Sequence, residues 1–277
     1  EGTNTSLSLP STRVDAFNIE LANELTRNGR RSGLTFAPEG GSERIRRVIN
    51  KTVSKEDLIR TVTAAYGAGW RQVKLYFMCG LPTETDEDVL EIADLAREVI
   101  RSGREASGRR DIRCTVPIGG FVPKPHTPFQ WVAQDTHSQV RQKLHLLGNQ
   151  LKGHGLHLRW NSIDDSQFEG IMARADRRMG RVIQRAWEAG CKFDAWQEFH
   201  HHERWLQAMS DEGLTPEFYT HRERGIDEVF PWDHIDAAVH KKFLKDDYLM
   251  SIKGETRVDC RDKCFACGIL PKFKEAR

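Results

Sequence analysis

The spacing of apolar residues changes repeatedly along the first 160 residues of the chain. Short apolar segments bounded by turn residues predict strands, and longer segments with apolar residues three and four positions apart predict helices. The predicted strands cover residues 6–9, 33–37, 72–78, 113–116 and 156–160. Helical segments alternate with these strands, which indicates an α/β fold of parallel strands joined by helical crossovers.

Polar residues mark where the predicted helices begin. Ser42 precedes a helix over 43–50, and Thr85 with Asp88 precedes another helix after the strand 72–78. Such side chains accept hydrogen bonds from the free N–H groups of a first helical turn. Each of these strands is therefore expected to lead through a short turn into a capped helix.

The pattern becomes helical after residue 160. Ser166 with Glu169 predicts the start of one long helix that ends at Gly190, and shorter helices are expected over 192–250. We expect three regions: residues 1–160 with the strands, a helical extension over 161–250, and a cysteine-rich tail over 251–277.

Composition narrows the class of protein. The 277 residues carry a net charge of +2 and are 38% hydrophobic, and no apolar run approaches the roughly 20 residues that cross a bilayer. We therefore expect a soluble, cytoplasmic protein without a membrane partner, and no general affinity for polyanions. The first residue is Glu1 rather than Met, so we expect the natural chain to begin earlier.

Three cysteines gather near the end of the chain. Cys260, Cys264 and Cys267 are separated by four and three positions, so their thiolates can converge on one soft metal centre. Zinc and an iron–sulfur cluster both fit this spacing, and three unligated thiols in a tail are the simpler alternative. We favour metal or cluster ligation.

The exits of the predicted strands form a second candidate site. In a parallel barrel the loops 38–42, 79–85 and 122–129 would share one rim, where ligands bind. Gly40 and Gly41 would free backbone amides for a carboxylate or a ribose hydroxyl, although each also fits an ordinary tight turn.

Several segments resemble radical S-adenosylmethionine (radical SAM) enzymes. Residues 8–17, 33–51, 73–89 and 121–131 are similar to the third to sixth strands and exit loops of that superfamily. More narrowly, they resemble the bacterial group with an amino-terminal cobalamin-binding-like domain and often a fused carboxy-terminal domain of unknown function. The later segments 166–178, 230–236 and 259–268 resemble the tail of that group.

The resemblance implies a fold, a chemistry and a set of contacts. The fold would be a partial (β/α) TIM-like barrel, strands three to six, followed by a mainly α-helical region and a Cys-rich tail. A 4Fe-4S cluster would give one electron to S-adenosylmethionine, producing a 5′-deoxyadenosyl radical that abstracts hydrogen from a substrate. The residues implied to contact S-adenosylmethionine are Glu39, Gly40, Gly41, Ser42, Met78, Gly80, Leu81, Val122 and Pro123.

The sequence departs from the family pattern in one respect. No Cys-x-x-x-Cys-x-x-Cys precedes the strand at 6–9, so we expect a carboxy-terminal fragment, inactive alone, whose radical-cluster ligands lie outside this chain. The tail cysteines would then hold an auxiliary cluster or zinc, and cobalamin use by a missing amino-terminal domain stays open. The implied partners are an electron donor such as flavodoxin or ferredoxin and an unknown substrate, with RNA as one guess. The alternative functions are a zinc- or cluster-containing RNA-binding module and a scaffold.

Other side chains have two readings each. His200, His201 and His202 could bind a metal, but a solvated helix face is the favoured reading. His126, between prolines in the loop 122–129, is the better functional candidate. Asp176 with the neighbouring Arg174, Arg177 and Arg178 could bind an anionic substrate, and surface ion pairs are slightly favoured.

Overall fold

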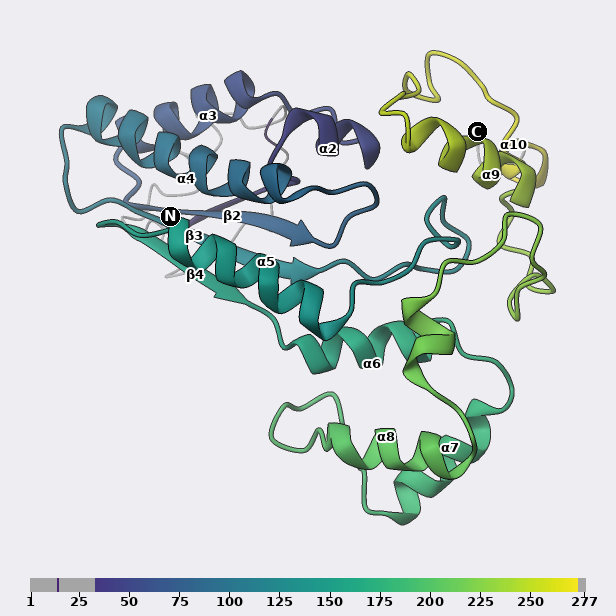
Figure 1. The fold of residues 1–277 in the computed structure, drawn as a ribbon. Helices are drawn as coiled ribbons and strands as arrows, with labels where there is room; N and C mark the ends of the chain where they lie inside the picture. The colour runs from purple at the N-terminus through teal and green to yellow at the C-terminus, as the bar shows by residue number, and fades with distance from the viewer. Residues whose placement is uncertain (1–13, 15–32, 274–277) are drawn as a thin grey trace, which may run out of the picture. The chain divides into compact units, whose positions relative to one another are not determined.

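The computed structural model describes Val14 and residues 33–273, which fall into two compact units (Figure 1). The first unit takes the residues up to 119 together with 141–161 and 254–256. The second unit takes 120–140, 162–253 and the tail from 257. The predicted strand 6–9 lies outside the described residues, and the division into 1–160, 161–250 and 251–277 stays a prediction.

A four-stranded parallel sheet forms the centre of the first unit. The strands lie in the order β1 (Leu34–Glu39), β2 (Gln72–Cys79), β3 (Arg113–Gly120) and β4 (Leu156–Trp160). β1 pairs in parallel with β2, and β3 in parallel with β4. The predicted α/β class is confirmed, and the sheet is consistent with a partial TIM-like barrel.

Helices follow the strands as the capping residues predicted. The helices that begin after these strands and their turns are α2 (Glu43–Val48), α3 (Lys55–Gly67), α4 (Asp86–Ser107) and α5 (His137–Gln150). The Ser42 hydroxyl accepts from the Ile45 N–H, and Thr85 and Asp88 form a reciprocal capping box. Figure 1 shows α3 and α4 side by side along the sheet.

The core of the first unit lies between the sheet and these helices. Phe36 and Leu75 on the strands are fully buried, as are Val62 of α3 and Ile92 of α4. Each such side chain contributes about 1.5–3 kcal/mol of transfer free energy on burial. Alternate residues of β1 and β2 are buried, so the sheet presents one face to this core.

The second unit is mainly helical. Its elements are α6 (Ile163–Ala173), α7 (Met179–Glu188), α8 (His202–Asp211), the π-helical turn η1 (Glu217–His221), α9 (Lys241–Ser251) and α10 (Ile269–Lys272). One buried cluster joins α6, α7 and α8 around Trp205, and another gathers Trp131, Phe230 and Trp232. No helix in the described part of the chain is long and apolar enough to cross a membrane.

The prediction of one long helix from Ser166 to Gly190 is wrong. Ser162, not Ser166, caps α6 by accepting from the Asp165 N–H at 3.1 Å. The chain leaves helical geometry after Ala173, and α7 begins at Met179. The Asp176 carboxylate accepts from the Arg178 N–H at 2.9 Å, a local hydrogen bond that competes with helix continuation.

Candidate functional site

The end of β1 carries the first predicted contact residue. Glu39 has a φ of 69°, which is uncommon for a residue other than glycine, and the β1–β2 register shifts between Phe36 and Glu39. Its side chain is 29% exposed, and burial raises the pKa of Glu39 although Lys51 lies 3.8 Å away. The carboxylate keeps acceptor capacity for a cationic or hydroxyl-bearing ligand.

The two glycines after Glu39 are required by packing. A Cβ at Gly40 would lie 2.6 Å from the Ile45 side chain, and one at Gly41 would lie 2.2 Å from the carbonyl oxygen of Asp88. Both distances are shorter than any real carbon contact. The turn therefore approaches α2 and α4 so closely that only glycine fits, whatever ligand the rim holds.

The hydroxyl of Ser42 is engaged within the protein. Ser42 is buried, and its Oγ donates to Asp88 Oδ1 at 2.5 Å while it accepts from the Ile45 N–H. Arg44 also donates to the Asp88 carboxylate. Ser42 therefore ties the turn after β1 to α4, and a hydrogen bond donated from its hydroxyl to S-adenosylmethionine would have to replace the bond to Asp88.

The exit of β2 combines an apolar lining with an internal ion pair. Met78 is half-buried and Leu81 is 3% exposed, while the Gly80 N–H donates to Glu84 Oε2 at 2.7 Å. Lys143 lies 2.8 Å from the same oxygen, with both side chains almost fully buried. Cys79 is fully buried in the core.

The predicted contacts after β3 belong to the second unit. Pro123 is buried and Val122 is half-buried, in the loop that contains Lys124 and His126. A contact of Val122 or Pro123 with S-adenosylmethionine stays a prediction.

The tail cysteines lie in the second unit. Cys260 and Cys264 are exposed and Cys267 is half-buried. The Ala266 N–H donates to Cys264 Sγ at 3.5 Å, a contact that also supports a ligating thiolate. The three sulfurs do not form a set within 4.8 Å in this structure, so their ligation of zinc or a cluster stays a prediction.

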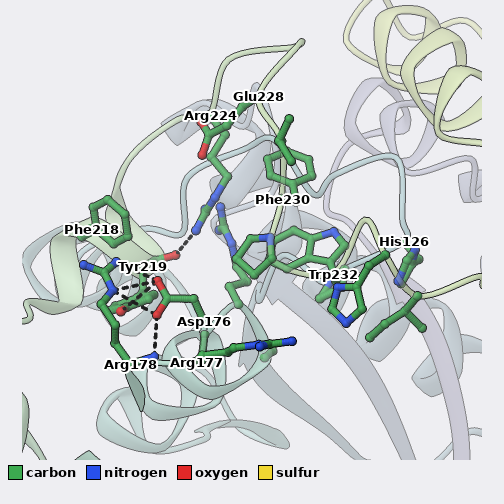
Figure 2. A pocket seen from close by; sticks show the side chains of 18 of the residues that line it. His126, Asp176, Arg177, Arg178, Phe218, Tyr219, Arg224, Glu228, Phe230 and Trp232 are labelled. Carbon is green, nitrogen blue, oxygen red and sulfur yellow. Dashed lines mark hydrogen bonds and ion pairs between the residues drawn. The ribbon is translucent and has the colours of Figure 1, made fainter. Parts of the chain in front are cut away.

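A cavity of about 1040 Å³ lies within the second unit (Figure 2). It is lined on one side by the segment between α6 and α7 and on the other by residues 218–235. Its cationic residues are Arg174, Arg177, Arg178, Arg222 and Arg224, and its aromatic residues are Phe218, Tyr219, Phe230 and Trp232. Five guanidinium groups face only two lining carboxylates, so the cavity favours an anionic ligand.

Two of these arginines are buried with unused hydrogen-bond donors. Arg174 is 1% exposed; its Nη1 donates to the Val132 carbonyl at 2.9 Å, but its Nε and Nη2 have no hydrogen-bond partner among the described residues. Arg224 is 7% exposed and donates from Nη2 to the Tyr219 carbonyl, while its Nη1 has no hydrogen-bond partner in the described part of the chain. Burial lowers the pKa of Arg224, against the pull of Glu228. Buried charged donors left without acceptors are costly, which is the expected cost of holding a site ready for an anion.

Of the three other guanidinium groups of the cavity, those of Arg222 and Arg178 are already paired, and Arg177 is exposed. Arg222 donates to both oxygens of Glu228 at 2.9 and 2.6 Å. Arg178 donates to Asp176 at 2.7 Å, and Figure 2 shows these bonds together with the Tyr219 hydroxyl on the same carboxylate. Paired groups shape the walls, so the unpaired donors of Arg174 and Arg224 define the binding chemistry.

His126 lies on the wall of this cavity; its role as a functional candidate stays a prediction. Its φ is 54°, its N–H donates to Gln130 Oε1 at 3.3 Å, and its buried Nε2 has no partner. Arg224 and Trp232 were missed by sequence reasoning. The usable signal is the segment 230–236, which contains Trp232 and resembles the tail of the radical SAM group.

Comparison with known proteins gives one family and one relative. Residues 1–96 match the family described as Radical SAM superfamily. The relative is named uncharacterized protein MJ0966, from Methanocaldococcus jannaschii, and is 29% identical over 208 residues. The aligned stretch is 75% of this chain but only 44% of the relative, so the chain spans less than half of that protein. The Radical SAM superfamily match thus includes β1, β2 and the exits that carry Glu39 and Gly80.

Proposed function

We propose that the chain is part of a radical SAM iron–sulfur enzyme, and that the cysteines of its radical cluster are supplied by sequence beyond these 277 residues. The observation that carries the proposal is the superfamily match over residues 1–96, which contains β1, β2 and the half-buried carboxylate of Glu39 at a strand exit. When bound, a 4Fe-4S cluster supplies the electron that cleaves S-adenosylmethionine and starts radical chemistry.

The residues of the first unit would bind and orient S-adenosylmethionine. The Glu39 carboxylate suits the amino group or the ribose hydroxyls, since its ion-pair partner among the described residues, Lys51, lies as far away as 3.8 Å. Met78 and Leu81 offer apolar side chains to the adenine ring. Ser42 and the Gly80 N–H serve mainly to fix the two turns, because both already have partners within the protein.

The second unit would hold the substrate by an anionic group. The unused donors of Arg174 and Arg224 fit a phosphate or carboxylate, and Trp232 and Phe218 offer rings for an attached planar group. An RNA substrate would bring phosphates and bases of this kind. We assign the tail cysteines to an auxiliary cluster or to zinc; the alternative of an RNA-binding module without enzymatic activity has no observation that favours it.

The test is cleavage of S-adenosylmethionine by the full-length gene product. The protein, reconstituted without oxygen with iron and sulfide and reduced with dithionite, should release 5′-deoxyadenosine, measured by mass spectrometry. Glu39→Gln should raise the KM for S-adenosylmethionine by about tenfold, the effect of one charge-assisted hydrogen bond. Glu56→Gln, at an exposed position of α3, is the matched control and should leave this KM unchanged.

One outcome would overturn the proposal. A protein whose cluster is intact by its electron paramagnetic resonance signal, but which produces no 5′-deoxyadenosine, is not a radical SAM enzyme. Equal KM values for the Glu39 and Glu56 variants would remove Glu39 from the binding site without affecting the superfamily assignment.

A further inference from the structure

Three residues of the second unit, each near the start of a helix, bring two imidazoles and a carboxylate together. His137 begins α5, Asp164 lies in the first turn of α6, and His202 begins α8. One donor atom from each lies within 4.8 Å of the other two, and His137 Nε2 is 3.5 Å from Asp164 Oδ1. It is the one such set of three in the described part of the chain.

The reading of residues 200–202 as a solvated helix face is wrong for two of the three histidines. The side chain of His200 is 6% exposed and its Nδ1 lies 2.5 Å from Asp165 Oδ1. His202 is half-buried, and its ring stacks with that of His137 at a centroid distance of 6.1 Å. Only His201 is exposed.

A chain of hydrogen bonds fixes which nitrogen of His202 carries the proton. The carbonyl oxygen of Gln134 can only accept, so His221 Nδ1, 3.0 Å away, donates to it. In the neutral ring His221 Nε2 must then accept, and it does so from Gln167 Nε2 at 2.9 Å. Gln167 therefore turns its oxygen toward His202.

This series of hydrogen bonds ends at His202, which keeps an unused lone pair on one ring nitrogen. Gln167 Oε1 accepts from His202 Nε2 at 3.0 Å, so that nitrogen carries the hydrogen. The other ring nitrogen, Nδ1, then has a lone pair, and it is buried without a hydrogen-bond partner. The Nε2 of His137 is likewise buried and makes no hydrogen bond within the described residues, with Asp164 Oδ1 3.5 Å away.

We propose that His137, Asp164 and His202 bind a divalent transition-metal ion of the zinc class, with His202 ligating through Nδ1. Imidazole nitrogens select such ions over Mg²⁺ or Ca²⁺, and a bond from His202 Nε2–H to Gln167 is the outer contact that ligating histidines usually make. Ligands of a tetrahedral zinc ion stand about 3.4 Å apart, close to the 3.5 Å between His137 and Asp164.

The site leaves room for a further ligand. The side chain of Asp164 is 51% exposed, so one side of the metal would face solvent. Two imidazoles and one carboxylate are three protein ligands, and the fourth position is free for water or a substrate oxygen. The proposal does not depend on the radical SAM assignment, since none of its residues belongs to the stretch 1–96.

Zinc titration tests this site directly. The chain is first stripped with chelator and carries serine at Cys260, Cys264 and Cys267, so that the tail cannot compete for the metal. Calorimetry with Zn²⁺ should show one ion per chain, and zinc should raise the melting temperature. His202→Ala should weaken zinc binding by at least about 100-fold and Asp164→Asn by at least about tenfold, because each loses a ligand. His201→Ala is the matched control and should stay within about twofold.

Two further measurements check that zinc binds at this site and through these ligands. Gln167→Leu removes the bond that fixes the His202 tautomer and should weaken zinc about tenfold without removing a ligand. Cobalt bound at this site should show visible d–d bands without intense thiolate charge transfer. The proposal is wrong if the parent protein binds no zinc, or if His202→Ala and Asp164→Asn bind it as tightly as His201→Ala; Asp164 is exposed, so its variant should fold.

Discussion

The two units differ in whether the polar groups at their candidate sites have hydrogen-bond partners within the protein. At the strand exits of the first unit, the Ser42 hydroxyl, the Gly80 N–H and the Asp88 carboxylate all have partners within the protein. In the second unit, Arg174 and Arg224 are buried with donors that have none. The first unit thus shows a scaffold whose turns are held firmly, and the second shows groups that an anion would satisfy.

The difference separates two kinds of evidence for a site. A resemblance points to positions such as Ser42 because related chains have a function there, but it cannot say whether a given side chain is occupied by packing. A buried donor without a hydrogen-bond partner is physical evidence of another kind, because leaving it unpaired costs free energy that a bound anion or water recovers. Variants that remove packing and variants that remove unused donors should therefore behave differently.

The largest effect is expected at Gly41. Gly41→Ala places a Cβ 2.2 Å from the Asp88 carbonyl oxygen and 2.8 Å from the Ile92 nitrogen, both backbone atoms of α4 that cannot move alone. We expect a loss of about 3 kcal/mol or more in the free energy of unfolding, measured with urea. Gly148→Ala in α5, where a Cβ would meet nothing within 4 Å, should be neutral or stabilising. Equal effects of the two changes would refute the packing role of Gly41.

A smaller effect on stability but a clear one on binding is expected at Arg174. Arg174→Met removes two unused donors from the cavity, so the Kd for pyrophosphate, measured by calorimetry, should rise by about 30-fold, or about 2 kcal/mol. The melting temperature is recorded in parallel because the Val132 carbonyl loses its partner. Arg181→Met removes an exposed arginine of α7 that does not line the cavity, and it should leave the Kd unchanged. The same Kd in both variants would remove the anion site.

An intermediate loss of stability is expected from a change at the start of α4. Thr85→Ala removes the hydroxyl that accepts from the Asp88 N–H and half of the capping box, at a cost of about 1 kcal/mol in unfolding free energy. Thr85→Ser keeps an oxygen in place and should lose much less. If alanine and serine are equally stable in urea denaturation, the cap does not hold this turn.

Local patterns predicted most of the fold of the first unit. The strands near residues 34, 72, 113 and 156 follow from short apolar segments, and the caps at Ser42 and Thr85 follow from side chains that act within three residues. The role of Ser42 as a tie to Asp88 could not be predicted in the same way, because the two residues are 46 positions apart and only the fold brings them together.

The cavity was harder to predict because its wall interrupts a regular pattern. Apolar residues at helical spacing continue from Phe168 through Ala175 to Val182, so periodicity alone predicts one helix. The break comes from the bond between the Asp176 carboxylate and the Arg178 N–H, and it turns the buried Arg174 toward the cavity wall. The polar run inside the helical pattern is the available signal; it predicts the ion pair of Asp176 with Arg178, which the structure confirms, but it does not indicate a cavity.

The smallest effect on stability is expected at Asp176, whose carboxylate is hydrogen-bonded by Arg178, whereas the nearby Arg174 keeps unused donors. Hydrogen bonding from Arg178 lowers the pKa of Asp176, so the folded state holds this proton less tightly than the unfolded chain does. The carboxylate therefore adds stability above the ordinary value of 3.8, and the contribution disappears as the pH falls through the lowered value in the folded protein. Asp176→Asn keeps an oxygen for the Arg178 N–H and removes only the charge. Since Arg178 is largely exposed, the loss at pH 7 should be about 0.5 kcal/mol, and it should shrink toward zero in urea melts near pH 3. A loss of stability that stays constant with pH would mean that the amide breaks the turn itself.

Pyrophosphate binding should not weaken in the Asp176→Asn variant, because Asp176 supplies no donor. A loss of affinity as large as that of Arg174→Met would erase the distinction between paired and unpaired groups of the cavity.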